Sequence, residues 1–167
     1  MKIRIAGTVN DSIVDGPGFR FTIFVQGCPH HCEGCHNPQT HSFSDGQDTT
    51  TEELFEKIKS NPLLDGVTFS GGEPFCQAEP LYFLGKKLAE NGYNIITYTG
   101  YNFEYLLGNT NDKNYYKELL SVTDVLVDGK FEIDKMSYLL KFKGSSNQRI
   151  LNCKKSLEVG EPIDLEL

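Results

Sequence analysis

The sequence predicts an α/β protein built as a partial, open βα barrel with a mainly parallel sheet. Segments typical of strands and of helices alternate along the chain, and the strand segments are short and almost wholly apolar, as in parallel sheets covered by helices. The chain has 167 residues, which suffices for one domain over residues 1–167. It falls short of the roughly 250 residues of a closed eight-fold barrel, so we expect one core and an open barrel.

Four segments predict the strands of this sheet, because each is rich in β-branched, aromatic or other large apolar residues. They are residues 19–26, 66–70, 93–98 and 124–127. A polar, cysteine-containing or glycine-rich loop follows each of them. Since functional groups of open parallel sheets gather at the carboxyl ends of the strands, we expect the four loops to share one face of the molecule.

Three segments predict helices between the strands. Thr50 and Glu53 have the spacing of a capping box, which predicts a short helix directly after them. Residues 79–90 carry leucines at spacings of three and four, and residues 115–120 form part of a third helix. We expect residues 156–167 to form either a poorly ordered tail or a closing edge strand.

The composition excludes several classes of function. Lys and Arg number 16 and Asp and Glu 23, a net charge of −7, so we expect no nucleic-acid partner bound through its phosphates. No run approaches the roughly 18 apolar residues of a membrane helix. The first residues alternate charged and apolar side chains where an export signal needs an apolar core. We therefore expect no membrane partner and a cytoplasmic protein.

Three of the five cysteines form the motif C-x3-C-x2-C at Cys28, Cys32 and Cys35. A tight, odd set of thiols in a chain without an export signal indicates metal binding or redox chemistry and not a disulfide framework. Three thiolates leave a four-coordinate centre one ligand short. An iron–sulfur cube then keeps one iron open for a small molecule, which suggests catalysis. Cys76 and Cys153 stand alone, and we expect both to be small buried apolar residues.

A closed zinc site is the competing interpretation of the same motif. All four histidines of the chain lie within the motif or shortly after it, at positions 30, 31, 36 and 41, so one of them could complete a Cys3His set. Such a site would make the protein a non-catalytic, zinc-binding interaction module.

Six short motifs together resemble the radical S-adenosylmethionine (SAM) superfamily, and within it the glycyl radical enzyme activases of anaerobic ribonucleoside-triphosphate reductase. The C-x3-C-x2-C motif in the loop after the first barrel strand is the signature of the superfamily. The motifs follow the family order over most of the chain, at residues 15–20, 27–38, 70–74, 98–101, 128–131 and 144–149.

This resemblance implies a radical SAM fold and one [4Fe-4S] cluster per chain on Cys28, Cys32 and Cys35. SAM would bind the fourth iron, and the reduced cluster would cleave it into methionine and a 5′-deoxyadenosyl radical. That radical would remove hydrogen from a glycine of the large reductase subunit, so the protein would be an oxidoreductase served by a flavodoxin- or ferredoxin-like electron donor. An activase of another glycyl radical enzyme, such as pyruvate formate-lyase, is the nearest alternative.

The resemblance also suggests which residues contact SAM. Gly71, Gly72 and Glu73 occupy the position of the family's GGE motif, where close backbone approach and a carboxylate hold the methionine ammonium. A tight turn would explain the same glycines without any ligand. Asp128 and Lys130 follow the fourth strand, where they form either a further cofactor contact or a turn with one solvated charge.

The resemblance also implies that the adenine of SAM is contacted by residues around the third cysteine. Many superfamily members have an aromatic residue directly before that cysteine, but here the position is Gly34. The resemblance therefore implies that the backbone of Gly34, Cys35 and His36, or the ring of His36, contacts the adenine.

Residues 130–155 carry seven basic side chains against Glu132 and Asp134, a local net charge of +5 in a chain of net −7. Most charged segments are simply solvated. The alternative is a docking surface for an acidic reductase or electron donor, because charge complementarity steers association.

Overall fold

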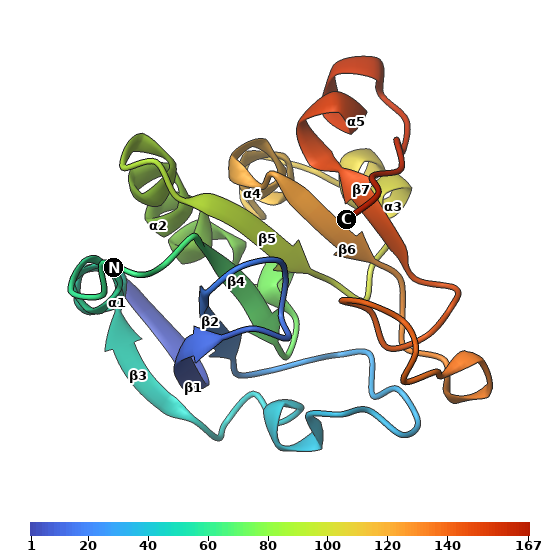
Figure 1. The fold of residues 1–167 in the computed structure, drawn as a ribbon, viewed down its shortest axis with the longest axis horizontal. Coiled ribbons are helices and arrows are strands. Elements are labelled where there is room, and N and C mark those ends of the chain that lie inside the picture. Colours follow the sequence, from blue (N-terminus) through green and yellow to red (C-terminus); the bar gives the residue numbers. More distant parts are fainter.

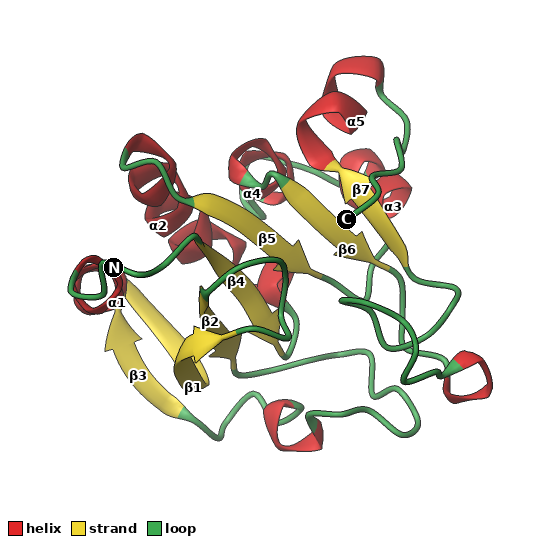
Figure 2. Cartoon of the chain, viewed as in Figure 1, coloured by secondary structure: helices red, strands yellow, loops and turns green.

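The computed structural model describes all 167 residues and confirms the α/β class and the open arrangement (Figures 1 and 2). One seven-stranded sheet has the order β3-β1-β2-β4-β5-β6-β7. Its four central strands are parallel: β2 (Arg20–Val25), β4 (Gly66–Gly71), β5 (Asn94–Tyr98) and β6 (Val125–Asp128). The flanking strands pair antiparallel: β1 (Lys2–Ser12), β3 (Gln47–Thr50) and β7 (Arg149–Asn152).

The four parallel strands match the four predicted segments closely. The three antiparallel strands were not predicted, so the expected order of alternating strands and helices was incomplete. β3 has the polar sequence QDTT and β7 has only four residues. Neither contains the apolar run by which the parallel strands are recognised.

The predicted helices are confirmed as α1 (Thr51–Lys59), α2 (Ala78–Glu90) and α4 (Tyr116–Val122), while α3 (Phe103–Gly108) and α5 (Cys153–Val159) were not predicted. α5 takes up the start of the expected tail, and the Leu165 N–H then donates to Ile150 O at 2.9 Å. Both expectations for residues 156–167 were therefore wrong for their first residues. None of the helices is long and apolar enough to cross a membrane.

Side chains cap the starts of the short helices. The Thr50 hydroxyl accepts from the Glu53 N–H at 3.1 Å, which confirms the predicted start of α1. The Asn102 side chain accepts from the Tyr105 N–H at 3.0 Å at the start of α3. Such caps satisfy backbone donors that the first turn of a helix leaves unpaired.

The two faces of the sheet are covered differently. The chain steps in one direction from β2 to β4, β5 and β6, so right-handed crossovers place their helices on one face. There α1 packs beside α2, α2 beside α4, and α4 beside α3 and α5 (Figure 1). The other face carries Ile96, Val125 and Val127. The loop over residues 13–19 covers part of it, held by a 2.9 Å hydrogen bond from Thr68 Oγ1 to Asp15 O.

Candidate functional site

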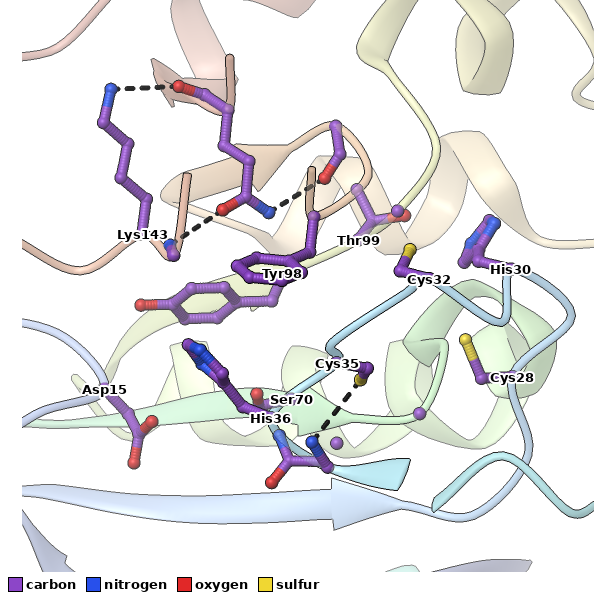
Figure 3. Close-up of a pocket in the computed structure, with 18 of the residues that line it drawn as sticks. Asp15, Cys28, His30, Cys32, Cys35, His36, Ser70, Tyr98, Thr99 and Lys143 are labelled. Carbon is purple, nitrogen blue, oxygen red and sulfur yellow. Dashed lines mark hydrogen bonds between the residues drawn. The ribbon is translucent and has the colours of Figure 1, made fainter. Parts of the chain in front are cut away.

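A cavity of about 380 Å³ opens at the carboxyl edge of the parallel strands, and the loops after all four strands contribute to its wall (Figure 3). The volume lies within the range of roughly 300–1,000 Å³ typical of ligand pockets. Six predicted site residues line it: Cys28, Cys32, Cys35, His36, Gly71 and Gly72. The other four, Gly34, Glu73, Asp128 and Lys130, do not.

The cysteine loop, residues 27–37, is closed at its base by backbone hydrogen bonds. The Gly27 N–H donates to Thr40 O at 2.7 Å, and the Cys28 N–H donates to His41 O at 3.1 Å. The acceptors lie at the end of the short 3-10 helix η1 (Pro38–Thr40). The segment that carries the thiols is thereby returned to the end of β2, beside the cavity.

The three thiols stand around the cavity and do not converge on one point. Cys28 is buried, and burial raises the pKa of its thiol. Cys32 and Cys35 are partly exposed. Nowhere do three His, Cys, Asp or Glu side chains meet closely enough to hold a single metal ion. Soft thiolate donors spread around one cavity fit a group of several metal atoms, such as an iron–sulfur cluster.

Glu73 is fully buried behind the cavity wall. A carboxylate offers about four acceptor positions, and here four protein groups donate to it. They are His30 Nε2 at 2.7 Å, the Gly100 N–H at 2.8 Å, and the Phe75 N–H and the Thr99 hydroxyl, both at 2.9 Å. The predicted contact between Glu73 and the SAM ammonium stays a prediction, while its contacts within the protein are in place.

Gly72 occupies a position without room for a side chain, and Gly34 has a backbone conformation that favours glycine. A β-carbon on Gly72 would lie 2.3 Å from Gly27 O, where the loops after β2 and β4 meet. Gly34 has a φ of +72°, and a β-carbon there would lie 2.6 Å from Ile133 Cδ1. Ile133 Cδ1 is the end of an exposed, flexible side chain that can move aside, so the positive φ gives the physical reason for the glycine at this position.

The segment 140–148 covers part of the cavity and is fastened from two sides. The Tyr98 hydroxyl donates to Phe142 O at 2.7 Å, and burial raises the pKa of Tyr98, so this donor stays neutral. The Gln148 side chain accepts from the Gly144 N–H at 2.8 Å and donates to Gly129 O at 2.9 Å. The end of β5 and the loop after β6 therefore hold this cover in place.

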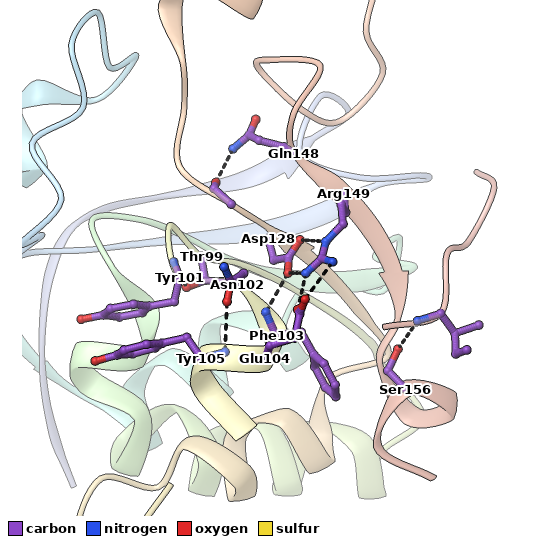
Figure 4. A network of polar contacts seen from close by, with 12 residues as sticks. Thr99, Tyr101, Asn102, Phe103, Glu104, Tyr105, Asp128, Gln148, Arg149 and Ser156 are labelled. Atoms are coloured by element: carbon purple, nitrogen blue, oxygen red, sulfur yellow. Dashed lines mark hydrogen bonds and ion pairs between the residues drawn. The ribbon is translucent and has the colours of Figure 1, made fainter. Parts of the chain in front are cut away.

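Asp128 and Lys130 lie away from the thiols, along a second, polar cavity of about 430 Å³. Asp128 is buried on the helix-covered side of β6 (Figure 4). Its carboxylate accepts from Arg149 Nε at 2.9 Å and from the Phe103 N–H of α3 at 2.8 Å. Its partners therefore join β6 to β7 and to α3.

Several basic side chains of the segment 130–155 are engaged within the protein. Arg149 pairs with Asp128 and Glu104, and these hydrogen bonds raise its pKa. The others with partners are Lys143, bound to Gln148 O at 3.0 Å, Lys154 with Asp124 at 3.8 Å, and Lys135 with Glu132 at 3.7 Å. The docking hypothesis therefore rests mainly on Lys130, Lys141 and Lys155, for which no ion pair is formed.

Sequence reasoning considered His30 only as one of four histidines that could complete a zinc site, and not as a ring that joins the cysteine loop to Glu73. It gave no role to Tyr98 in the cavity wall. The only signal for His30 was its place between two clustered cysteines. Cys153 is buried, as expected. Cys76 is exposed, so the expectation that it is buried was wrong; it lies on the short 3-10 helix η2 (Pro74–Gln77) at the surface.

The model of a protein family described as a 4Fe-4S single cluster domain matches residues 14–151, which is most of the chain. The chain belongs to the 4Fe-4S single cluster domain family. The match contains all three clustered cysteines and every loop of the thiol-lined cavity. The family's description implies an iron–sulfur cluster for this chain.

Two curated relatives have names that agree with the resemblance found in the motifs. The anaerobic ribonucleoside-triphosphate reductase-activating protein of Pasteurella multocida is 34% identical over 146 residues, covering 83% of this chain and 90% of that protein. The pyruvate formate-lyase-activating enzyme of Clostridium pasteurianum is 40% identical over 134 residues, covering 76% of this chain. The chain spans only 52% of the Clostridium enzyme. The resemblance to the activating proteins is thus confirmed.

Among solved structures, the crystal structure of QueE from Escherichia coli aligns with a TM-score of 0.48 at 21% identity, over 60% of this chain and 53% of that one.

Proposed function

We propose that this chain is a radical SAM activating enzyme that generates a glycyl radical on anaerobic ribonucleoside-triphosphate reductase. One observation carries the proposal: the thiols of the C-x3-C-x2-C motif surround a single cavity at the carboxyl edge of the sheet. The chain spans 90% of the Pasteurella protein but 52% of the Clostridium enzyme. The Pasteurella relative, matched over 90% of its own length, is named as a reductase-activating protein, which supports the reductase as the partner.

Cys28, Cys32 and Cys35 would hold a [4Fe-4S] cluster with one open iron. When bound and reduced, the cluster supplies the electron that splits the sulfonium carbon–sulfur bond of SAM into methionine and a 5′-deoxyadenosyl radical, which takes a hydrogen atom from the partner's glycine. The protein's own task is to present three thiols to one cavity and to keep water away from the reaction.

The methionine end of SAM would lie against Gly71 and Gly72. Glycines have no side chain, so a ligand can approach their backbone closely. Glu73 follows them directly, and its buried negative charge favours a cationic ligand at this wall. We assign the adenine to Cys35 and His36, which also line the cavity.

Gly34 belongs to the proposed adenine contact through its backbone. Asp128 and Lys130 are left out of the proposed site, because they line the second cavity and the Asp128 carboxylate already has partners. Tyr98 and the segment 140–148 would limit the access of water to the thiol-lined cavity.

The rest of the proposal follows from the chemistry. Breaking a bond of SAM with an electron makes the protein an oxidoreductase, and that electron has to come from a donor such as a flavodoxin- or ferredoxin-like protein. Free, clustered thiols favour the reducing cytoplasm. We also propose that residues 1–167 act as one domain, since a single sheet contains strands from both ends of the chain.

Electron paramagnetic resonance of the anaerobically reconstituted, dithionite-reduced protein tests the cluster. We expect a reduced [4Fe-4S] signal that changes when SAM is added. Cys32→Ala should abolish the signal, and Cys76→Ala, which alters an exposed thiol away from the motif, should leave it unchanged. A colourless protein with stoichiometric zinc and no iron signal would point to the non-catalytic zinc module instead.

Radical transfer to purified partners tests the identity of the substrate. The protein is incubated with SAM, reductant and either the large reductase subunit or pyruvate formate-lyase, and the glycyl radical signal is recorded. We expect the glycyl radical signal only in the incubation that contains the reductase subunit, and not in the one with pyruvate formate-lyase. A signal only with pyruvate formate-lyase would keep the chemistry and change the partner.

A further inference from the structure

His30 lies between the first two clustered cysteines, yet its ring is inserted into the protein. Its side chain, which is labelled in Figure 3, is only 6% exposed, and its Nε2 lies 2.7 Å from the Glu73 carboxylate. The next residue, His31, is exposed. Two adjacent residues of the same type in one loop therefore have opposite surroundings.

The slot that receives the His30 ring is formed by residues after two parallel strands. Tyr101 packs edge-on against the ring, with 4.6 Å between ring centroids. Gly100 provides the space, because a β-carbon there would lie 2.4 Å from His30 Cδ2. The ring thus contacts two successive residues of the loop after β5, and Tyr101 is itself stacked on Tyr105 (Figure 4).

Glu73 is a rigid acceptor for this ring. Its carboxylate also accepts hydrogen bonds from the N–H groups of Phe75 and Gly100 and from the hydroxyl of Thr99. These three donors hold both of its oxygens independently of His30. Three segments far apart in the sequence, the cysteine loop and the loops after β4 and β5, meet at this point.

We propose that His30 is a positioning residue, which fastens the cysteine loop to the carboxyl edge of the sheet through Glu73 and so holds the thiols around the cavity before a cluster is present. The inference rests on the proposed function only in naming the cluster as the group that the thiols receive. It gives Glu73 a task within the protein, as the acceptor for groups of the cavity wall.

The first test uses the protein without a cluster. Hydrogen–deuterium exchange of residues 27–37 and of the Gly100 amide is compared in the wild type, His30→Ala and His30→Gln. We expect faster exchange in His30→Ala, because the loop loses its link to Glu73, and near-normal exchange in His30→Gln, whose side-chain amide can still donate. His31→Asn is the matched control, since Asn tolerates the positive φ of this exposed position.

The second test follows the reconstituted cluster, through the rate at which a chelator removes iron and the line shape of the reduced resonance signal. Loss of a residue that orients metal ligands typically costs about 10–100-fold in metal affinity, so His30→Ala should lose iron faster by a factor of about that size. Gly100→Ala, which leaves His30 and Glu73 in the sequence but fills the slot, should shift both measurements in the same direction.

Three outcomes would overturn the inference. Equal exchange in wild type and His30→Ala would mean that the loop needs no anchor. An unrescued His30→Gln would mean that the ring acts by packing alone and not through Glu73. An effect of His31→Asn as large as that of His30→Ala would mean that any change in the loop suffices. If the wild type held no cluster, the proposed function would fail, but the exchange experiment would still decide the role of His30.

Discussion

Two buried carboxylates at the carboxyl edge of the sheet serve different parts of the molecule. Glu73 follows β4 and Asp128 ends β6; they are 0% and 1% exposed, and each accepts from a backbone N–H and from a basic side chain. The partner of Asp128 is Arg149 of β7, whereas the partner of Glu73 is His30 of the cysteine loop. The segment that supplies the partner thus decides whether a carboxylate braces the fold or shapes the site.

The direction of each side chain explains the difference. Neighbouring strand residues point to opposite faces of a sheet. Val127 belongs to the cluster on the open face, so Asp128 points to the helix-covered face, where it meets the start of α3. Glu73 lies beyond the last residue of β4, after two glycines, and its N–H donates to Gly27 O at 2.8 Å. Its position is therefore tied to the cysteine loop from the backbone onward.

The largest effect is expected from Arg149→Ala, which leaves the Asp128 carboxylate buried with only the Phe103 N–H as a partner. Removing one member of a buried ion pair costs about 3–5 kcal/mol, and because Arg149 is 31% exposed we expect the lower end of that range. Urea unfolding of the cluster-free protein measures it. If Asp128 braces the fold and not the site, the folded Arg149→Ala protein should also bind as much cluster per molecule as the wild type.

A double variant checks the cause of this loss. Asp128→Asn removes the charge that Arg149→Ala leaves behind, so the two changes together should cost less than the sum of the single changes. A strictly additive result would mean that the ion pair contributes little and that Arg149 acts through its packing.

Glu73→Gln should give a smaller loss of stability but a clear effect on the site. Phe75 and Gly100 donate to different oxygens of Glu73, and a glutamine replaces one of these oxygens by an NH2 group. One of the two N–H groups then loses its acceptor, and an unsatisfied buried donor costs about 1–3 kcal/mol. The free energy of unfolding and the iron content are measured on the same preparations. Full cluster content in the folded Glu73→Gln protein would remove the difference between the two carboxylates.

The parallel strands and their shared edge could be predicted from sequence, because buried parallel strands are continuous apolar runs. The edge strands could not. β1 alternates charged and apolar residues over its first positions, and β7 contains only RILN before α5. The register that brings Asp128 opposite Arg149 depends on β7, so this pair was out of reach once β7 was missed.

The candidate site also has features that could be predicted from sequence and features that could not. The cysteine motif and the glycines after β4 were found from their spacing, and they line one cavity. The direction of Asp128 could not be read from β6, because the sequence VLVD is apolar at three successive positions and gives no alternation to show which face is which. The inserted ring of His30 depends on Gly100, which is 70 residues further along the chain, and no local pattern reports such a contact.

The start of α3 gives an intermediate effect, because it is held by both its own cap and Asp128. Asn102 accepts from the Tyr105 N–H, and Asp128 accepts from the Phe103 N–H. Loss of a capping side chain typically costs about 1 kcal/mol, so Asn102→Ala should destabilise the protein by about that amount in thermal or urea unfolding. A loss as large as that of Arg149→Ala would show that the cap, and not the buried ion pair, holds this edge of the fold.

The smallest effect is expected at Glu104, the outer carboxylate on Arg149. Its side chain is 58% exposed and lies 2.6 Å from Arg149 Nη2, and this hydrogen bond is the main reason that its pKa is lowered. Exposed pairs contribute about 0.2–1 kcal/mol, so Glu104→Gln should cost no more than that. Because the folded pKa is the lower one, the contribution is present above the unfolded pKa of about 4.3 and is lost as the pH falls through the folded value.

The measurement is the difference in unfolding free energy between wild type and Glu104→Gln, at neutral pH, at acid pH and at high salt. We expect a small difference at neutral pH. It should shrink in acid, where the wild-type Glu104 is protonated and as uncharged as the glutamine of the variant, and at high salt, which screens exposed charges. A difference that matched Arg149→Ala and resisted salt would place the main partner of Arg149 on the outside of the molecule. The ion pair with Asp128 would then not be the main contact that stabilises this edge of the sheet. The different roles of Asp128 and Glu73 would have to be explained by burial alone.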